Sequence, residues 1–162
     1  CEASYPTGID ALRHPSSRIC AGYNRDHPRH PGQLVTVTYL DTSAAMKLLV
    51  DEPESDALLH ELTTTARDLV ASWLLHAELH CAAGRNPSLI EFHAITTVLD
   101  AVTLIDVTRG DLLSAGTHAP LRSNDAIHLA TALRVGVDEV LTYDGELSAA
   151  AKRSGLRVLA PS

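Results

Sequence analysis

The hydrophobic positions of the chain follow two periods, which alternate from about residue 34 to the C-terminus. Short runs rich in Val, Leu, Ile and Thr are typical of buried strands. Between them, apolar residues recur every three or four positions, which is typical of helices. The predicted strands cover residues 34–40, 68–71, 102–107, 139–144 and 156–159. Strands that are separated by helices predict an α/β fold, with a mostly parallel sheet covered on both faces.

Local signals place the ends of the predicted helices. Proline is expected in a first helical turn, Ser, Thr or Asn at an N-cap, and glycine after the last turn. The predicted helices cover residues 43–50, 53–62, 73–84, 87–99, 109–116, 125–134 and 146–153. The signals are Pro53 and Pro87 in first turns, Ser72 and Ser123 or Asn124 as N-caps, Thr108 with Asp111 as a capping box, and Gly84 and Gly136 as ends.

Residues 1–33 differ from the rest of the chain. They contain four prolines and four arginines with little periodic hydrophobicity, which is typical of extended or partly disordered segments. We therefore predict an N-terminal arm over residues 1–33 and one folded domain over residues 34–162. The arginines of this arm are able to contact a phosphate backbone, although a solvated tail is the simpler interpretation.

Composition narrows the class of protein. A chain of 162 residues that is 45% hydrophobic suffices for one core. The formal net charge of −7 argues against a protein that coats polyanions, but bound cations reverse the charge of an acidic site. Three widely spaced cysteines favour a reducing, cytoplasmic location. No apolar run approaches the roughly 18 residues of a membrane-spanning helix, so no span is predicted.

Acidic residues follow two of the predicted strands and directly precede helices. Asp41 comes after Leu40, and Asp144 comes after Tyr143. Parallel strands have their C-terminal ends on one edge of the sheet, where α/β proteins bind ligands, so we expect both acids on the same rim. Each acid is explained equally well as a helix N-cap, which contributes about 1 kcal/mol.

Two further acids lie on predicted helices among apolar residues. The positions three and four residues from Glu78 hold Leu74, Leu75, Cys81 and Ala82. A carboxylate buried there is costly unless it is paired or bound to a metal. Asp125 heads a stripe with His128 and Leu129, although the helix dipole alone favours a first-turn acid by about 0.3–1 kcal/mol. We interpret His128 as a packed or hydrogen-bonded residue rather than a ligand.

If the four acids converge, their charges require neutralisation. Two carboxylates about 4 Å apart repel by roughly 4 kcal/mol at an effective dielectric constant of about 20, so the cluster must take up protons or bind cations. Oxygen ligands favour Mg²⁺ or Mn²⁺, and such ions activate water for attack on phosphorus. The prediction is metal-assisted phosphodiester hydrolysis with four candidate catalytic and metal-binding residues: Asp41, Glu78, Asp125 and Asp144.

Other acid-rich α/β proteins fit the sequence less well. A phospho-receiver domain needs a second early acid beside Asp41 and a lysine late on a strand, and the chain has neither. A haloacid-dehalogenase-type phosphatase needs an Asp two residues after Asp41, where this chain has Ser43. The run His76-Ala77-Glu78-Leu79-His80 does not have the H-E-x-x-H order of zinc proteases.

The motifs around the four acids resemble those of PIN-domain proteins, most closely the VapC-type toxins of bacterial toxin–antitoxin pairs. The motifs are Tyr39-Leu40-Asp41-Thr42-Ser43-Ala44, Ser72 with Glu78, Asp125-Ala126-Ile127-His128-Leu129-Ala130-Thr131-Ala132, and Leu141-Thr142-Tyr143-Asp144. The likeness covers residues 35–162, with all four acids in the family's order. It implies a Rossmann-like (PIN) three-layer domain with four to five strands, and a Mg²⁺- or Mn²⁺-dependent endoribonuclease.

The resemblance also implies roles and partners. It implies Asp41 and Asp125 as principal metal ligands, Glu78 and Asp144 as completing the shell, and Ser43 and Thr142 as supporting hydroxyls. The implied partners are an RNA substrate, a second copy in a homodimer, and a small VapB-like antitoxin. The motifs do not identify RNA-binding residues. Candidate phosphate contacts are Arg85, Arg109, Arg122, Lys152 and Arg153.

Two features depart from the family pattern. About 33 residues precede the first predicted strand, where toxins of this kind usually have only a few, and few lysines lie near the motifs. The long arm makes the toxin role less secure than the nuclease role. A separate alternative is a PIN-like domain with weak or no catalysis that serves as an RNA- or protein-binding regulatory module.

Overall fold

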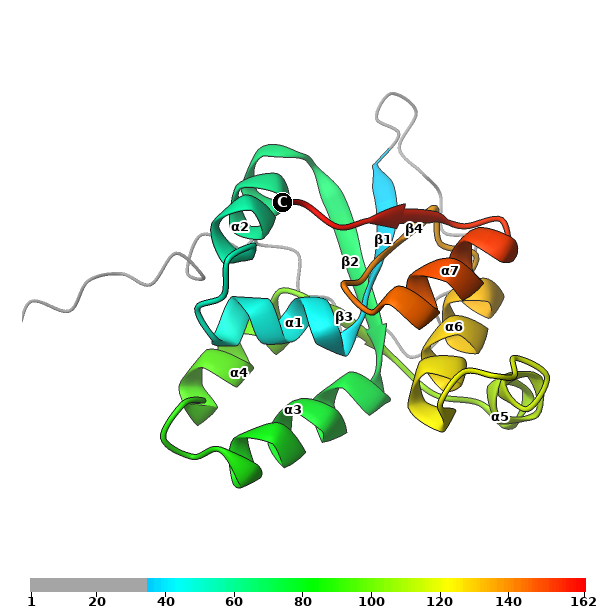
Figure 1. The fold of residues 1–162 in the computed structure, drawn as a ribbon, viewed down its shortest axis with the longest axis horizontal. Helices are drawn as coiled ribbons and strands as arrows, with labels where there is room; N and C mark the ends of the chain where they lie inside the picture. The colour runs from blue at the N-terminus through cyan, green and yellow to red at the C-terminus, as the bar shows by residue number, and fades with distance from the viewer. Residues whose placement is uncertain (1–34) are drawn as a thin grey trace, which may run out of the picture.

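The computed structural model describes residues 35–162, which form a five-stranded parallel sheet with helices on both faces (Figure 1). The predicted arm at residues 1–33 lies outside the described residues, so its extent stays a prediction. The strands are β1 (Thr36–Leu40), β2 (Arg67–Ser72), β3 (Thr103–Ile105), β4 (Glu139–Leu141) and β5 (Arg157–Leu159). The predicted fold class is confirmed, and the sheet is parallel throughout.

The order of the strands reverses direction at the centre of the sheet. The order is β3-β2-β1-β4-β5, so the chain moves outward from β1 in one direction and then returns to the other side of β1. Tyr39 pairs with Val140 and Leu40 with Leu141 in the register between β1 and β4. Such a reversal point, at the C-terminal ends of the strands, is where open α/β sheets bind ligands. Asp41 follows β1 at this point.

Within residues 35–162, seven helices cover the sheet in two groups. They are α1 (Thr42–Leu49), α2 (Ser55–Thr64), α3 (Trp73–Arg85), α4 (Phe92–Asp100), α5 (Arg109–Ala115), α6 (Ser123–Val135) and α7 (Gly145–Arg153). Figure 1 shows α1 to α4 on one side of the sheet and α5 to α7 on the other. A right-handed connection between parallel strands places consecutive crossover helices on one face until the direction reverses.

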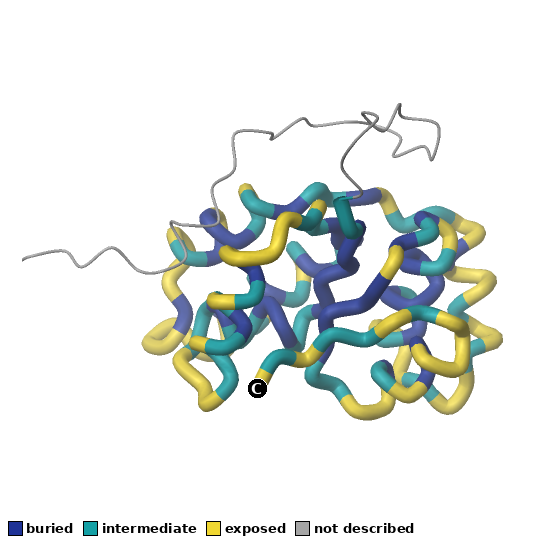
Figure 2. Tube along the Cα trace, turned by 90° about the horizontal axis from the view of Figure 1, so that it is seen from above, coloured by how far each residue is buried: buried dark blue, intermediate teal, exposed yellow. Residues whose placement is uncertain are grey.

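Alternate strand residues serve two separate cores. Leu40, Ala71 and Leu141 pack with the apolar stripes of α1 to α4. Tyr39 and Val140, their neighbours in sequence, pack with α6 and α7. The strands are therefore buried on both faces, which explains why they read as nearly continuous apolar runs. Figure 2 shows the buried residues concentrated along the central strands, with exposed residues at the periphery.

Several predicted ends agree with the structure. Gly136 follows α6 with a φ of 70°, a left-handed conformation that glycine adopts at little cost. The predicted capping box at the start of α5 is confirmed, since Thr108 accepts from the backbone of Asp111 while the Asp111 side chain accepts from the backbone of Thr108.

Other predicted ends are wrong. Pro53 and Pro87 precede their helices instead of lying in the first turn. Helix α2 begins at Ser55 and helix α4 begins at Phe92. Gly84 lies inside α3 rather than after it, and α6 starts at Ser123, so neither Ser123 nor Asn124 is its N-cap. Ser72 occupies the N-cap position of α3, but its side chain makes no capping hydrogen bond. Four of the strands are shorter than predicted, and β4 ends at Leu141, three residues before Asp144. β2 (Arg67–Ser72) is longer than the predicted 68–71 by one residue at each end.

Within residues 35–162, none of the helices combines the length and apolar character needed to cross a membrane.

Candidate active site

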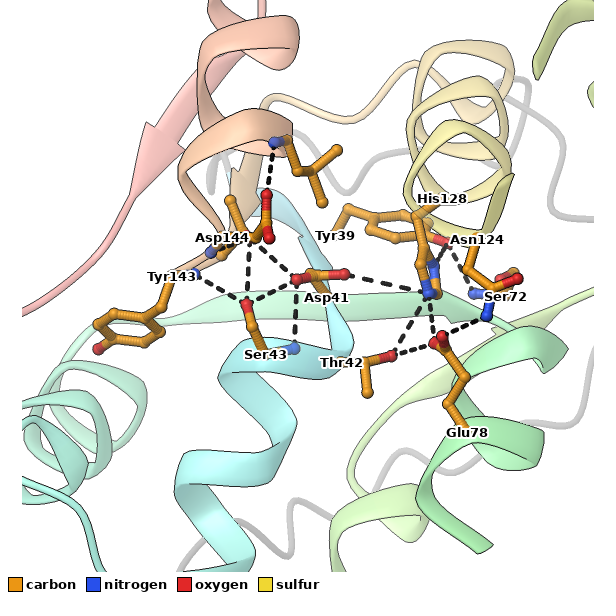
Figure 3. A network of polar contacts seen from close by, with 12 residues as sticks. Tyr39, Asp41, Thr42, Ser43, Ser72, Glu78, Asn124, His128, Tyr143 and Asp144 are labelled. Carbon is orange, nitrogen blue, oxygen red and sulfur yellow. Dashed lines mark hydrogen bonds and ion pairs between the residues drawn. The ribbon is translucent and has the colours of Figure 1, made fainter. Parts of the chain in front are cut away.

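Asp41 lies at the centre of a polar cluster beyond the ends of β1 and β4 (Figure 3). Its side chain is buried, and its Oδ2 atom accepts three hydrogen bonds: from the Ser43 backbone N–H at 3.2 Å, from Ser43 Oγ at 2.6 Å and from Thr142 Oγ1 at 2.9 Å. Its Oδ1 atom accepts no hydrogen bond from the described residues; His128 Nε2 lies 4.0 Å away. The carboxylate is thus held by one oxygen while the other is available.

The hydroxyls of Ser43 and Thr142 join the two central strands at this point. Ser43 Oγ accepts from the Tyr143 backbone N–H at 2.9 Å, and Thr142 Oγ1 accepts from the Asp144 backbone N–H at 3.1 Å. The two hydroxyl oxygens lie 3.2 Å apart. Since each hydroxyl donates to Asp41 and accepts from the segment after β4, the pair sets the position of Asp41 relative to that segment.

Asp144 and Asp125 lie at the starts of α7 and α6. Asp144 is the N-cap of α7, where its Oδ1 accepts from the Leu147 backbone N–H at 2.7 Å. Asp125 lies in the first turn of α6 and is half-buried. Burial raises the pKa of Asp125, and the negative charges of Asp144, Asp41 and Glu78 raise it further. Asp125 is therefore close enough to the other three predicted acids for their charges to act on it.

Glu78 is held from three directions rather than lying in an apolar stripe. Its Oε1 accepts from Asn124 Nδ2 at 2.8 Å, while its Oε2 accepts from Thr42 Oγ1 and contacts His128 Nε2 at 2.8 Å. Burial by itself raises the pKa of Glu78, but the hydrogen bonds from His128, Thr42 and Asn124 outweigh it, so the pKa is lowered. Glu78 is thus held as a carboxylate.

The predicted surroundings of Glu78 need a correction. The buried stripe of α3 consists of Leu75, Leu79 and Ala83, whereas Cys81 is exposed. Glu78 lies at the flank of this stripe, with 22% of its side chain exposed. The inference that the carboxylate must be paired holds, but its partners come from α1 and α6 rather than from its own helix.

His128 and Tyr39 form the buried part of the cluster. Both are buried, and Tyr39 Oη lies 2.9 Å from His128 Nδ1, with the rings edge to face. Tyr39 Oη also accepts from the Ser72 backbone N–H at 3.1 Å. The interpretation of His128 as a hydrogen-bonded residue is confirmed. Sequence reasoning missed its contact with Glu78, and also the parts played by Tyr39, Thr42 and Asn124.

The donors of the cluster fit a hard divalent cation by their chemistry. Asp41 Oδ1 and the carboxylate of Asp125 carry no hydrogen bond from the described residues, and burial together with the neighbouring negative charges raises the pKa of Asp125. Oxygen donors of this kind suit Mg²⁺ or Mn²⁺. Among residues 35–162, however, no three His, Cys, Asp or Glu side chains form a ligand set as they stand.

Comparisons with known proteins identify the family. A model of the PIN domain matches residues 38–153. The chain is similar to ribonuclease VapC46 of Mycobacterium tuberculosis, with 43% identity over 76% of this chain and 97% of the relative. It is also similar to ribonuclease VapC35 of the same species, with 38% identity over 76% of this chain and 96% of the relative.

Solved structures share the fold at lower identity. The M. tuberculosis toxin VapC20, described as cleaving the sarcin–ricin loop, has a TM-score of 0.58 at 18% identity, over 70% of this chain and 94% of that one. A VapBC2 structure from Rickettsia felis, bound to a promoter DNA fragment, has a TM-score of 0.60 at 15% identity, over 78% and 100%. From the family match and the curated relatives together, the chain belongs to the PIN-domain family and, within it, to the VapC ribonucleases.

Proposed function

We propose that this protein is a Mg²⁺- or Mn²⁺-dependent endoribonuclease and the toxin of a toxin–antitoxin pair. The observation that supports the proposal is that His128 Nε2 lies between two of the acids, 4.0 Å from Asp41 Oδ1 and 2.8 Å from Glu78 Oε2, while the charges of Asp144, Asp41 and Glu78 act on Asp125. Relatives at 43% and 38% identity are named ribonucleases, which supports RNA as the substrate. A cytoplasmic location accords with such a substrate.

The acids of the site have two proposed tasks, which are to hold the cation and to orient the attacking water. When bound, a divalent cation polarises the phosphate and lowers the pKa of water. Asp41 and Asp125 are the proposed ligands because they carry oxygens without hydrogen bonds from the described residues, and Asp144 has one such oxygen. Glu78 has three donors for about four acceptor positions of a carboxylate. It therefore keeps room for one further partner, which we propose is the attacking water or the cation.

The activity is tested with single-stranded RNA and purified protein. We expect cleavage in Mg²⁺ or Mn²⁺, none with a chelator, and a 5′-phosphate on the downstream product by mass spectrometry. Asp41→Asn and Asp125→Asn should each lower kcat by about a hundredfold or more, because each removes a charge at the reacting centre. Asp68→Asn is the matched control, since Asp68 is an exposed acid on β2.

The results also separate the two interpretations of the sequence. Equal cleavage by the wild-type protein and both site variants would place the reaction elsewhere. A wild-type protein that binds RNA or a partner without cleaving either would favour the regulatory module. The observation that favours the regulatory module is that the described residues do not form a complete set of metal ligands.

The partners are proposed on separate grounds. Solved relatives of the same fold include complexes named VapBC-1, from nontypeable Haemophilus influenzae, and a toxin–antitoxin complex from Klebsiella pneumoniae. We propose a small VapB-like antitoxin and a homodimer for this chain. Light scattering of the purified protein tests the homodimer. Co-purification with the product of an adjacent small gene tests the antitoxin. The exposed basic candidates at Arg85, Arg109, Arg122, Lys152 and Arg153 stay predictions for RNA contact.

A further inference from the structure

A continuous chain of hydrogen bonds runs from the end of β2 to Glu78 through the buried layer beneath the acids (Figure 3). It passes from the Ser72 backbone N–H to Tyr39 Oη, from Tyr39 Oη to His128 Nδ1, and from His128 Nε2 to Glu78 Oε2, over distances of 3.1, 2.9 and 2.8 Å. Tyr39 is fully buried and His128 is 1% exposed, so neither side chain is placed to contact RNA.

The donors and acceptors of this chain determine where the imidazole proton lies. His128 Nε2 lies 2.8 Å from the Glu78 carboxylate, which only accepts hydrogen bonds, so Nε2 is the nitrogen that carries the proton. A neutral imidazole with its proton on Nε2 has an unprotonated Nδ1, which accepts the hydroxyl proton of Tyr39 at 2.9 Å. The Nε2–H group then donates to Glu78 Oε2, which also receives the Thr42 hydroxyl.

We propose that His128 is a positioning residue for Glu78, with Tyr39 holding the imidazole in the Nε2–H tautomer. An aliphatic side chain would fill the site without leaving polar atoms to satisfy, so packing alone does not account for an imidazole there. The imidazole Nε2 lies between two acids, 2.8 Å from Glu78 Oε2 and 4.0 Å from Asp41 Oδ1. It holds the Glu78 carboxylate in one orientation while leaving Asp41 Oδ1 available. The proposal rests on the nuclease function proposed above.

The tautomer is measured without any catalytic assay. Nitrogen-15 NMR of the imidazole ring distinguishes Nε2–H from Nδ1–H. We expect the pure Nε2–H form in the wild-type protein and a mixture of tautomers in Tyr39→Phe, which retains the ring but lacks the hydroxyl. An Nδ1–H imidazole in the wild-type protein would overturn the proposal, and so would a Tyr39→Phe spectrum unchanged from wild type.

Kinetics then test whether His128 acts through Glu78. His128→Leu should lower kcat for RNA cleavage by about tenfold or more, with KM within about twofold, since it removes a hydrogen bond to a charged group. His128→Gln places an amide N–H near the position of Nε2 and should stay within about threefold of wild type. Glu78→Gln alone and together with His128→Leu completes a double-mutant cycle. We expect the double variant to be no slower than Glu78→Gln.

The outcomes separate this proposal from the function on which it rests. Losses that multiply in the double variant, or equal losses in His128→Leu and His128→Gln, would overturn the positioning role. Urea unfolding of each variant confirms that the assayed protein is folded, and Tyr39→Phe with His128→Gln provides a second pair if His128→Leu does not fold. If the wild-type protein does not cleave RNA, the nuclease proposal fails, and the tautomer measurement still decides whether His128 donates to Glu78.

Discussion

Asp41 is both a helix N-cap and the centre of the candidate site. Its Oδ2 atom receives the backbone N–H of Ser43, as a cap does, together with the two hydroxyls. Its Oδ1 atom receives no hydrogen bond from the described residues. The two interpretations that the sequence left open are therefore compatible, because a carboxylate has two oxygens and each can serve one of them.

The Thr142 hydroxyl tests how much the orientation of Asp41 matters. Thr142→Val keeps the shape of this buried side chain but removes its hydrogen bond to Asp41 Oδ2. We expect kcat to fall by about tenfold, because a hydrogen bond to a charged group contributes about 1.5–3 kcal/mol. Steady-state cleavage of RNA measures the effect. Thr142→Ser restores the hydroxyl and should recover most of the rate. The control is Thr65→Val, at an exposed threonine, which should leave kcat unchanged. Equal rates in the Val and Ser variants would contradict the prediction.

At the scale of elements, α6 shows tertiary surroundings overriding a local preference. Asp125 lies in the first turn of α6, where the helix dipole favours the ionised carboxylate. Its pKa is nevertheless raised, because burial and the charges of Asp144, Asp41 and Glu78 oppose ionisation. The acid is positioned by its helix and made unusual by residues from three other segments.

Helix α5 shows a local motif completed by a distant residue. The capping box of Thr108 and Asp111 is visible in the sequence, but Asp111 Oδ1 also accepts from Arg134 Nε of α6 at 2.7 Å. Burial by itself raises the pKa of Asp111, yet the bonds from Arg134 and Thr108 outweigh it and lower the pKa below its ordinary 3.8. The ionised form of Asp111 therefore ties α5 to α6.

This pair predicts a pH-dependent stability. The folded pKa of Asp111 is below the unfolded value, so its contribution is complete above about pH 4 and is lost as the pH falls through the folded pKa. Asp111→Asn should lower the free energy of unfolding by about 2–3 kcal/mol at pH 7, and by progressively less below pH 4. Urea denaturation of the wild-type protein and the variant at pH 7 and pH 3 measures the difference in the free energy of unfolding. The control is Asp106→Asn, at an exposed acid of the preceding loop, which should leave the free energy of unfolding unchanged at either pH. A difference that persists unchanged at pH 3 would contradict the assignment.

At the scale of the whole molecule, the two edges of the sheet hold different polar networks. The C-terminal edge carries the acids with few cations. The opposite edge carries a salt-bridge network in which Arg67 Nη1 contacts Glu139 Oε1 at 2.8 Å and Arg67 also contacts Glu61. Thr38 donates to the same Glu139 oxygen at 2.8 Å. This network joins β1, β2, α2 and β4 away from the candidate site.

Removing one partner of that network should affect stability without affecting catalysis. Glu139→Ala leaves the nearly buried Arg67 short of a counter-charge, and breaking such a pair costs about 3–5 kcal/mol. We expect a loss of that size in urea unfolding and an unchanged kcat per folded molecule. Glu146→Ala, at an exposed acid of α7, is the control. A change in kcat at temperatures where the variant is fully folded would show that the two edges are coupled.

Sequence by itself determined the class of fold and the identity of the acids. Strands such as β1 are apolar on both faces and are followed by a polar residue. Neighbouring residues alone therefore predict the strand and the carboxylate that follows it. The motifs around Asp41, Asp125 and Asp144 carried the family resemblance, which the PIN-domain match confirms. The helix starts at Ser55, Phe92 and Ser123 were missed because proline and cap signals fix a boundary only to within a few residues.

Only the tertiary structure decided how the acids are held. The partners of Glu78 are Thr42, Asn124 and His128, which lie far from it in the sequence and reach it because α1, α3 and α6 meet at one edge of the sheet. No local period encodes such a meeting. For the same reason the proposed Nε2–H tautomer of His128, which rests on its contacts with Glu78 and Tyr39, could be inferred only from the folded chain.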